Sequence, residues 1–166
     1  MIRQVEGDIL LTQASAIAHG VAPSDHFNSG LALALREQFP AMAKDFRHFC
    51  SQNHPHAGSV WTWSGSGQDG HARTIINLLT QEPSEGPGGL PGKAKLTHVN
   101  HALKELAGLV RKNGYKSLSL PRLATGVGGL DWSDVLPLIE KHLGDLDIPV
   151  IIYKTFHAGQ KADEGL

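Results

Sequence analysis

The chain has 166 residues, which suits one domain of ordinary size and is too short for two well-filled ones. Hydrophobic residues make up 40% and charged residues 19%, a composition that excludes a largely disordered protein. Fifteen Lys and Arg residues against 16 Asp and Glu residues give a formal net charge of −1, so no overall positive field exists to hold nucleic acid or an anionic membrane. Any contact with nucleic acid is therefore expected to be local.

The N-terminal residues and the single cysteine bear on the cellular compartment. Cys50 cannot form an intramolecular disulfide, and a lone thiol is typical of a reducing environment. The helical spacing around Cys50 favours a buried structural thiol over a nucleophile. Residues 1–11 carry Arg3, Glu6 and Asp8, unlike a signal peptide, and no apolar run reaches the roughly 18 residues that a membrane span requires. We expect a cytoplasmic protein.

Apolar runs and turn residues alternate along the first half of the chain. Residues 14–19 are almost uniformly apolar, as expected for a strand covered on both faces of its sheet. Leucines and alanines after Gly30 favour a helix that breaks at Pro40 and resumes with apolar residues every three to four positions. The predicted elements are strands at 2–5 and 14–19, a loop at 20–30, helices at 31–39 and 40–50, and an antiparallel pair of strands at 59–63 and 74–80.

The second half begins with a loop at 82–92 that holds three prolines and four glycines, which favours a mobile or functional loop. An apolar stripe then predicts a helix that Asn113-Gly114 ends. The predicted elements are a helix at 97–112, a strand at 117–120, a glycine-rich loop at 121–130, a helix at 131–143, a strand at 148–153 and a polar, frayed tail at 157–166.

This order of elements predicts the fold class. Strands that alternate with helices indicate α/β layering around a largely parallel or mixed sheet. Such sheets bind ligands beyond the carboxyl ends of their strands. No internal repeat is present, so we expect a single domain.

Two glycine-containing loops follow predicted strands and precede helices, at 20–30 and 122–130. The first amides of a helix lack internal partners and lie at the positive end of its dipole, so two such loops facing each other would hold a diphosphate. The spacing of Gly126, Gly128 and Gly129 matches neither the dinucleotide-binding fingerprint nor a Walker loop, which argues against the common NAD and ATP folds. Taken alone, these glycines are equally consistent with ordinary turns.

Several ordered motifs lie at compatible spacing along the chain. They are Gly7-Asp8-Ile9-Leu10, the strand at 14–19, Asn28-Ser29-Gly30-Leu31-Ala32-Leu33, Phe39-Pro40, and Leu120-Pro121-Arg122-Leu123 through Gly128-Gly129-Leu130-Asp131-Trp132. Together they resemble a macrodomain, over nearly the whole chain from Ile2 to about Phe156. The chain is most similar to the branch of terminal ADP-ribose protein glycohydrolases, ADP-ribose-1''-phosphate phosphatases and the bacterial antitoxins that strip ADP-ribose from DNA.

The resemblance implies a fold and a ligand. The implied fold is a three-layer α/β/α macrodomain with a mixed, largely parallel central sheet of about six strands, in one domain at 1–156 with a polar tail at 157–166. The implied ligand is ADP-ribose. Asp8 matches the aspartate that selects adenine by accepting its exocyclic amine, with the Ile9 amide beside it, although a turn carboxylate after Gly7 is the alternative. Tyr153 matches the aromatic residue beside adenine, with Phe156 as a substitute; an ordinary strand aromatic is the other interpretation.

The same resemblance assigns the diphosphate loops and His19, and the nearby loops supply further catalytic candidates. His19 matches an active-site histidine and is expected to act as a general base, since the pKa of an imidazole lies near neutrality, although a strand-end histidine also serves to satisfy a backbone group. Asp25 and His26 would position water, or would be surface loop residues. Asp131 is the third catalytic candidate and is also a natural helix N-cap. The diphosphate loops correspond to Asn28, Ser29, Gly30 and Leu31 and to Ala124, Thr125, Gly126, Val127 and Gly128.

Two positions depart from the pattern of the branch. Gln81 stands where these glycohydrolases carry a lysine, and glutamine has no ammonium to donate. Gly128 stands where the protein glycohydrolases carry an aspartate. Lys93 and Lys95 are candidates to replace the lysine, or are solvated loop residues.

Two functions from different classes therefore stand beside each other. The first is a hydrolase that removes ADP-ribose from a modified protein or nucleic acid, or dephosphorylates ADP-ribose-1''-phosphate, with no cofactor and no metal. The second is a non-catalytic module that reads ADP-ribose. A weaker third is a nucleotide-responsive interaction domain that uses the loop at 82–92. The expected partners are ADP-ribose or ADP-ribosylated macromolecules, with no membrane, and we expect a monomer.

Overall fold

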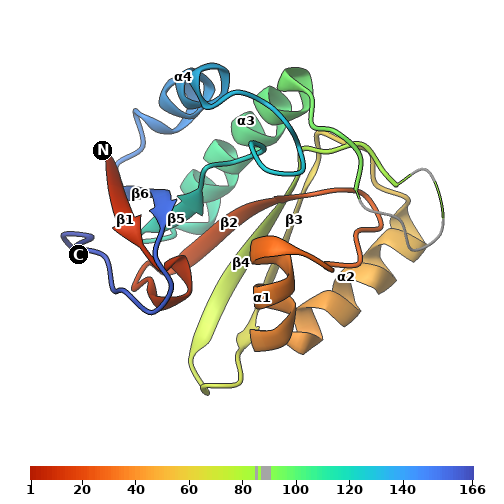
Figure 1. The fold of residues 1–166 in the computed structure, drawn as a ribbon, viewed down its shortest axis with the longest axis horizontal. Coiled ribbons are helices and arrows are strands. Elements are labelled where there is room, and N and C mark those ends of the chain that lie inside the picture. Colours follow the sequence, from red (N-terminus) through yellow and green to blue (C-terminus); the bar gives the residue numbers. More distant parts are fainter. Residues whose placement is uncertain (85, 87–90) are drawn as a thin grey trace.

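A computed structural model of the chain describes residues 1–84, 86 and 91–166, so residues 85 and 87–90 of the predicted Pro/Gly loop lie outside it. The described residues form one six-stranded sheet surrounded by helices (Figure 1). The strands are β1 (Ile2–Gly7), β2 (Ala16–Val21), β3 (Val60–Ser66), β4 (Ala72–Leu79), β5 (Leu118–Pro121) and β6 (Val150–Phe156). The helices are α1 (Gly30–Gln38), α2 (Pro40–Asn53), α3 (Leu96–Asn113), α4 (Trp132–Leu143) and the short 3-10 helix η1 (Ile9–Leu11).

The sheet has the strand order β1-β6-β5-β2-β4-β3. Each neighbouring pair is parallel except β3 and β4, which form the predicted antiparallel hairpin. The prediction of a mixed, largely parallel sheet is therefore confirmed. Because β2 and β5 are parallel neighbours, the loops that follow both of them emerge at the same end of the sheet.

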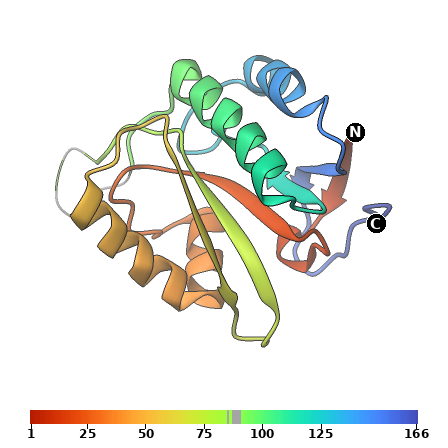
Figure 2. The same ribbon diagram turned by 180° about the vertical axis from the view of Figure 1, so that it is seen from behind.

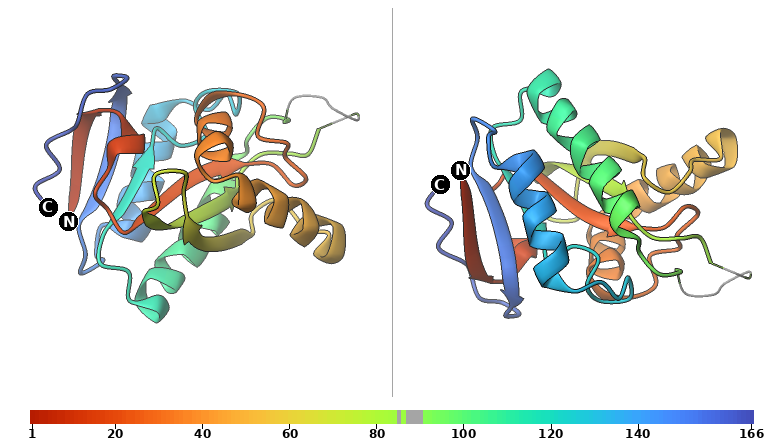
Figure 3. Two further views of the ribbon diagram at one scale, coloured as in Figure 1. Left: turned by 90° about the horizontal axis from the view of Figure 1, so that it is seen from below. Right: turned by 90° about the horizontal axis from the view of Figure 1, so that it is seen from above.

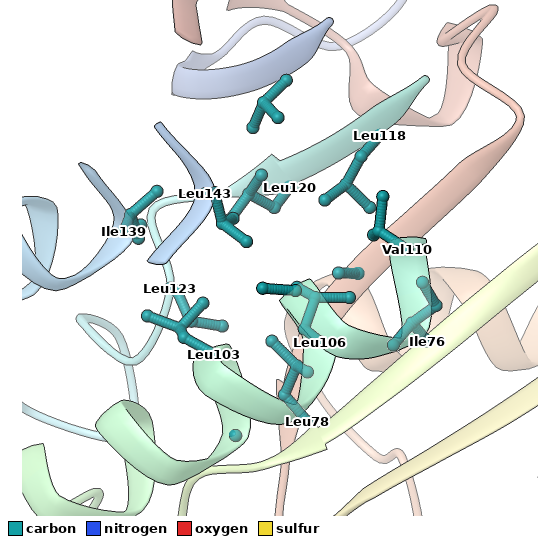
Figure 4. Close-up of a cluster of buried hydrophobic side chains, with 14 of the residues drawn as sticks. Ile76, Leu78, Leu103, Leu106, Val110, Leu118, Leu120, Leu123, Ile139 and Leu143 are labelled. Atoms are coloured by element: carbon teal, nitrogen blue, oxygen red, sulfur yellow. The ribbon is translucent and has the colours of Figure 1, made fainter. Parts of the chain in front are cut away.

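Helix pairs cover both faces of the sheet, which confirms the predicted three layers (Figures 1 and 3). On one face α3 and α4 pack against alternate strand residues such as Ile76, Leu78 and Leu120, all fully buried (Figure 4). Residues that alternate with these, such as Ile75 and Leu79, face α1 and α2 instead. Helices α1 and α2 thus lie against the face of the sheet opposite to α3 and α4 (Figure 2).

The helix boundaries follow from local chemistry. Pro40 is the first residue of α2, a position at which a backbone N–H would have no partner within the helix, so the lack of one costs nothing. Helix α1 ends two residues earlier, at Gln38. Gly114 ends α3 in the left-handed conformation at φ 66°. Strand β6 runs to Phe156, three residues beyond the predicted end, because it pairs with β1 as far as Gly7 and Phe156. That pairing is a tertiary contact, which apolar periodicity does not report.

The prediction of a frayed tail at 157–166 is wrong. Ala162 and Glu164 are buried, and the amide of Asp8 donates to the carbonyl of Gln160 at 2.7 Å. The segment has no regular secondary structure, but backbone and side-chain hydrogen bonds hold it against the start of η1. The polar composition of this segment predicted that it is exposed. Its polar groups are instead buried because they find hydrogen-bond partners in other parts of the chain.

Cys50 is 5% exposed on the inner face of α2, as predicted for a structural thiol, and its burial raises the pKa of the thiol. Among the described residues, no helix is both long and apolar enough to cross a membrane.

Candidate functional site

Two cavities meet where β2 and β5 end, and together they form one groove. Their volumes are about 360 and 450 Å³, and both are lined by Gly30, Leu31 and Pro121. We call the first the polar compartment, which is also lined by His19, Asp25, Gln81 and Arg122 among others. We call the second the apolar compartment, which is completed by Ile9, Leu10, Ala34, Tyr153 and Phe156.

The loop between β2 and α1 forms one wall of the polar compartment. Asp25 folds this loop, because its carboxylate accepts the amide of Ala22 at 3.0 Å and that of Phe27 at 2.9 Å. Phe27 is fully buried beneath the loop. Ser29 precedes α1 without capping it through its side chain, and the first residues of that helix line the compartment. An anion placed there meets free N–H groups and the positive end of the helix dipole.

The loop between β5 and α4 forms the opposite wall. The Leu130 amide donates to the Ala124 carbonyl at 3.0 Å, and the Gly128 carbonyl accepts the Ala94 amide at 2.9 Å. A Cβ at Gly128 would lie 2.6 Å from the Ala124 carbonyl oxygen and 2.9 Å from the Ala94 Cβ. The loop in this conformation therefore has no room for an aspartate side chain at position 128, where the resemblance expects one.

His19 projects from β2 toward the same sheet face as Phe27 and is 2% exposed. Its register partner on β4 is Asn77, and His19 Nε2 lies 2.7 Å from Asn77 Oδ1. Because the Asn77 amide nitrogen is directed to the Trp61 carbonyl at 3.5 Å, Oδ1 is the acceptor and His19 Nε2 carries the proton. His19 Nδ1 then retains the lone pair.

The prediction that His19 titrates near neutrality is wrong. Burial lowers its pKa to about 4, and the opposing effects of the Asn77 hydrogen bond and the Asp25 charge are smaller. The imidazole is therefore neutral at physiological pH and is a weaker base than an exposed histidine.

Gln81 lines the polar compartment from the end of β4 and is 7% exposed. Its side-chain nitrogen donates to the Gly92 carbonyl at 3.1 Å, so the amide group ties the base of the Pro/Gly loop. Lys95 pairs with Glu82 at 2.8 Å, and the side chain of Lys93 lies over Gly129. Neither lysine lines the groove, so within the part of the chain that the structure describes no substitute ammonium group enters it.

Arg122 lines the polar compartment, and the sequence did not single it out as a site residue. Its guanidinium lies 5.5 Å from the ring centre of Trp132. Among the described residues, it is the one permanently charged cation that lines the groove. Its position directly after β5, inside a motif of the resemblance, was the signal that could have identified it. The register partner Asn77 had no such signal, because only the pairing of β2 with β4 brings it to His19.

Two aromatic residues line the apolar compartment. Phe156 is 63% exposed, whereas Tyr153 is buried and donates its hydroxyl to Glu164 at 2.8 Å. The exposed ring of Phe156 offers the larger free face to a flat ligand. Asp8 directly precedes the lining residue Ile9, and its carboxylate accepts the amides of Leu10 at 3.0 Å and Gly159 at 2.9 Å. The turn carboxylate interpretation therefore describes its contacts, and adenine selection by Asp8 stays a prediction.

The structure brings most of the predicted site residues to the groove and leaves four outside its lining. Those that line it are Ile9, His19, Asp25, Ser29, Gly30, Leu31, Ala124, Gly126, Val127, Gly128 and Tyr153. Those that do not are Asp8, Asn28, Thr125 and Asp131. Asn28 is turned to Arg36, whose guanidinium donates to it at 2.6 Å, and Asp131 is the N-cap of α4 by position but makes no capping hydrogen bond. Within the described residues, no group of three or more His, Cys, Asp or Glu side chains could hold a metal.

The geometry matches a known family. The family model for the Macro domain matches residues 17–139, from β2 into α4. The chain belongs to the macrodomain family. The match includes both loops of the polar compartment, and the resemblance inferred from the sequence motifs is confirmed.

Individual relatives refine the comparison. The chain is 27% identical over its full length to the DNA ADP-ribosyl glycohydrolase of Mycobacterium tuberculosis, and it spans 45% of that protein. The match to the human ADP-ribose glycohydrolase OARD1 is 22% identical, over 92% of this chain and 90% of OARD1. The structure of Thermosipho africanus DarTG in complex with ADP-ribose superposes with a TM-score of 0.78 at 24% identity, over 96% of this chain and 42% of that one. The chain thus spans less than half the length of the DNA glycohydrolases that it matches.

Proposed function

We propose that this macrodomain binds ADP-ribose along the whole groove. The observation that carries the proposal is the junction of the two compartments at Gly30, Leu31 and Pro121. One compartment presents backbone amides and Arg122, as an anionic diphosphate requires, and the other presents aliphatic and aromatic side chains, as a purine requires. A dinucleotide-like ligand with a charged centre and a flat end fits that order.

The activity that we propose is hydrolysis of an ADP-ribosyl linkage. The relatives that support it are named DNA ADP-ribosyl glycohydrolase and ADP-ribose glycohydrolase. The substrate class is accordingly an ADP-ribosylated nucleic acid or protein, with ADP-ribose-1''-phosphate as the remaining candidate. We also propose that the protein is cytoplasmic, in keeping with its lone thiol, and that it is monomeric.

Hydrolysis breaks the bond between the distal ribose and its acceptor; water supplies the new hydroxyl of the ribose, and its remaining proton goes to the released acceptor. Asp25 is the candidate carboxylate that lines the polar compartment, so it is better placed than Asp131 to orient that water. Neutral His19 offers an acceptor at Nδ1 without adding a charge beside the diphosphate.

A reader module is the second candidate, and a specific observation favours it. Gln81 occupies the position at which the branch carries lysine, and its amide is engaged with the Gly92 carbonyl. The glycine at 128 cannot be exchanged for aspartate without moving the Ala124 carbonyl. Both departures remove groups that could act as acids or bases, while leaving the binding surfaces in place.

A paired assay on purified protein separates the two candidates. Calorimetric titration with ADP-ribose tests binding, and release of ADP-ribose from modified DNA, glutamate-modified protein and the 1''-phosphate tests turnover. Binding with release from one substrate supports the hydrolase and identifies its class. Binding without any release supports the reader, and Q81K is then the variant in which to seek a gain of turnover. Absence of binding at millimolar ligand would contradict both.

A further inference from the structure

Glu164 is a buried carboxylate that no sequence motif singled out, and it is 6% exposed. It accepts hydrogen bonds from the Thr12 hydroxyl, from the Gln13 amide at 2.8 Å and from the Tyr153 hydroxyl at 2.8 Å. Thr12 Oγ1 in turn accepts the Ala14 amide at 3.2 Å, so its own proton is directed to Glu164. Burial of a carboxylate is unfavourable unless hydrogen bonds replace its water, and here three neutral donors do so.

The partners of Glu164 belong to two walls of the apolar compartment. Tyr153 on β6 lines the compartment directly. Thr12 and Gln13 follow η1, whose first residues, Ile9 and Leu10, line it from the other side. One buried carboxylate therefore connects β6 to the segment that follows η1. Burial and the neighbouring carboxylate raise the pKa of Tyr153, which keeps its hydroxyl protonated as a donor.

The same tail segment makes a second connection at Asp8. The Gly159 amide donates to Asp8 Oδ2 at 2.9 Å, and the Asp8 amide donates to the Gln160 carbonyl at 2.7 Å. The tail approaches so closely that a Cβ at Gly7 would lie 2.8 Å from the Gln160 oxygen. The turn that leads into η1 is therefore held from outside by residues 159 and 160.

We propose that residues 157–166 set the shape of the base-binding end of the groove, and that Glu164 is the positioning residue that does so. This inference rests on the proposed function, since it assigns a purine to the apolar compartment. Loss of Glu164 leaves two buried hydroxyls without an acceptor and removes the side-chain link between β6 and the segment after η1, while the backbone pairing of β6 with β1 remains. Affinity for the base should then fall, while the polar compartment, which makes no contact with Glu164, keeps its affinity for sugar phosphate.

The test compares two ligands on the wild-type protein and on E164A, well below the unfolding temperature. ADP-ribose carries the base, and ribose 5-phosphate lacks it. We expect E164A to weaken ADP-ribose by about tenfold and ribose 5-phosphate by less than about twofold. Y153F retains the ring and loses the donor, so it should show part of the same selective loss. E164Q keeps an acceptor and should restore part of the affinity.

Asp163 provides the matched control. It is the neighbouring tail carboxylate, its side chain is 89% exposed, and it pairs with Arg3 at 3.3 Å. D163N should leave both affinities unchanged. Equal losses for the two ligands in E164A, or no loss for either, would overturn the positioning role while leaving the proposed function intact. Failure of the wild-type protein to bind ADP-ribose would overturn the proposed function, and this inference with it.

Discussion

The two compartments of the groove share Gly30, Leu31 and Pro121 but present different kinds of group to a ligand. In the polar compartment, Asp25 accepts two backbone amides, the side-chain nitrogen of Gln81 donates to the Gly92 carbonyl, and His19 Nε2 donates to Asn77. Recognition of the diphosphate there falls to backbone amides and to Arg122. In the apolar compartment, side chains such as Tyr153 and Phe156 form the surface themselves. The polar end should therefore be sensitive to backbone shape, and the apolar end to the size of individual side chains.

The sharpest test of this difference is G128A, for which we expect the largest effect. The new Cβ would lie 2.6 Å from a carbonyl oxygen, so the loop must move, with a loss of about 2–4 kcal/mol of stability and at least about a hundredfold of ADP-ribose affinity. G126A is the matched control for stability, because its Cβ meets no other atom of the protein within 4 Å. Chemical denaturation and calorimetry measure both. Similar behaviour of the two variants would contradict a backbone-shaped site.

Acidification tests the buried histidine. The unfolded chain protonates His19 near its ordinary pKa of 6.5, whereas the folded protein resists until about 4, so the unfolded state binds more protons between these values. The His19 contribution to stability is complete above pH 6.5 and falls by about 3 kcal/mol as pH drops to 4. H19Q should flatten this part of the pH–stability curve measured by urea unfolding. H26N, which alters an exposed loop histidine, should leave it. An unchanged slope in H19Q would show that another group dominates.

The apolar end is tested by F156A. Loss of the exposed ring removes a stacking surface, and we expect about a five- to twentyfold loss of ADP-ribose affinity with stability changed by less than about 0.5 kcal/mol. L96A truncates an exposed leucine that does not line the groove and is the control. Titration with ADP-ribose measures both. Full affinity in F156A would transfer the base-stacking role to Tyr153.

The smallest effect is expected at Gly30, which both compartments share. G30A meets no neighbour within 4 Å but must adopt φ +59°, so the unfolding free energy should fall by about 1 kcal/mol, or about 2–4 °C in Tm. Gly108 in α3 also has open space, but no positive φ is required there, so G108A should stabilise the protein by roughly 0.5–1 kcal/mol. Equal shifts in the same direction would show that the backbone conformation of Gly30 is not under strain.

Local signals were sufficient for the order of the elements but not for their ends or for the tail. Helix starts and stops at Pro40 and Gly114 follow from single-residue chemistry, and the structure has them there. Strand β6 is longer than predicted because its last residues pair with β1. The tail was predicted to fray because it is polar, yet Glu164 is buried among donors from distant parts of the chain.

The sequence by itself determined the α/β class, the macrodomain family and the two loops that line the polar compartment, because periodicity and short motifs carry that information. Only the tertiary structure decided the pKa of His19 and the requirement for glycine at position 128. Pairing of β2 with β4 places Asn77 beside His19 and removes the imidazole from water, which lowers its pKa. Packing of Ala94 against the second loop requires glycine at 128. These properties depend on distances between residues far apart in the chain, and such distances exist only once the sheet has formed.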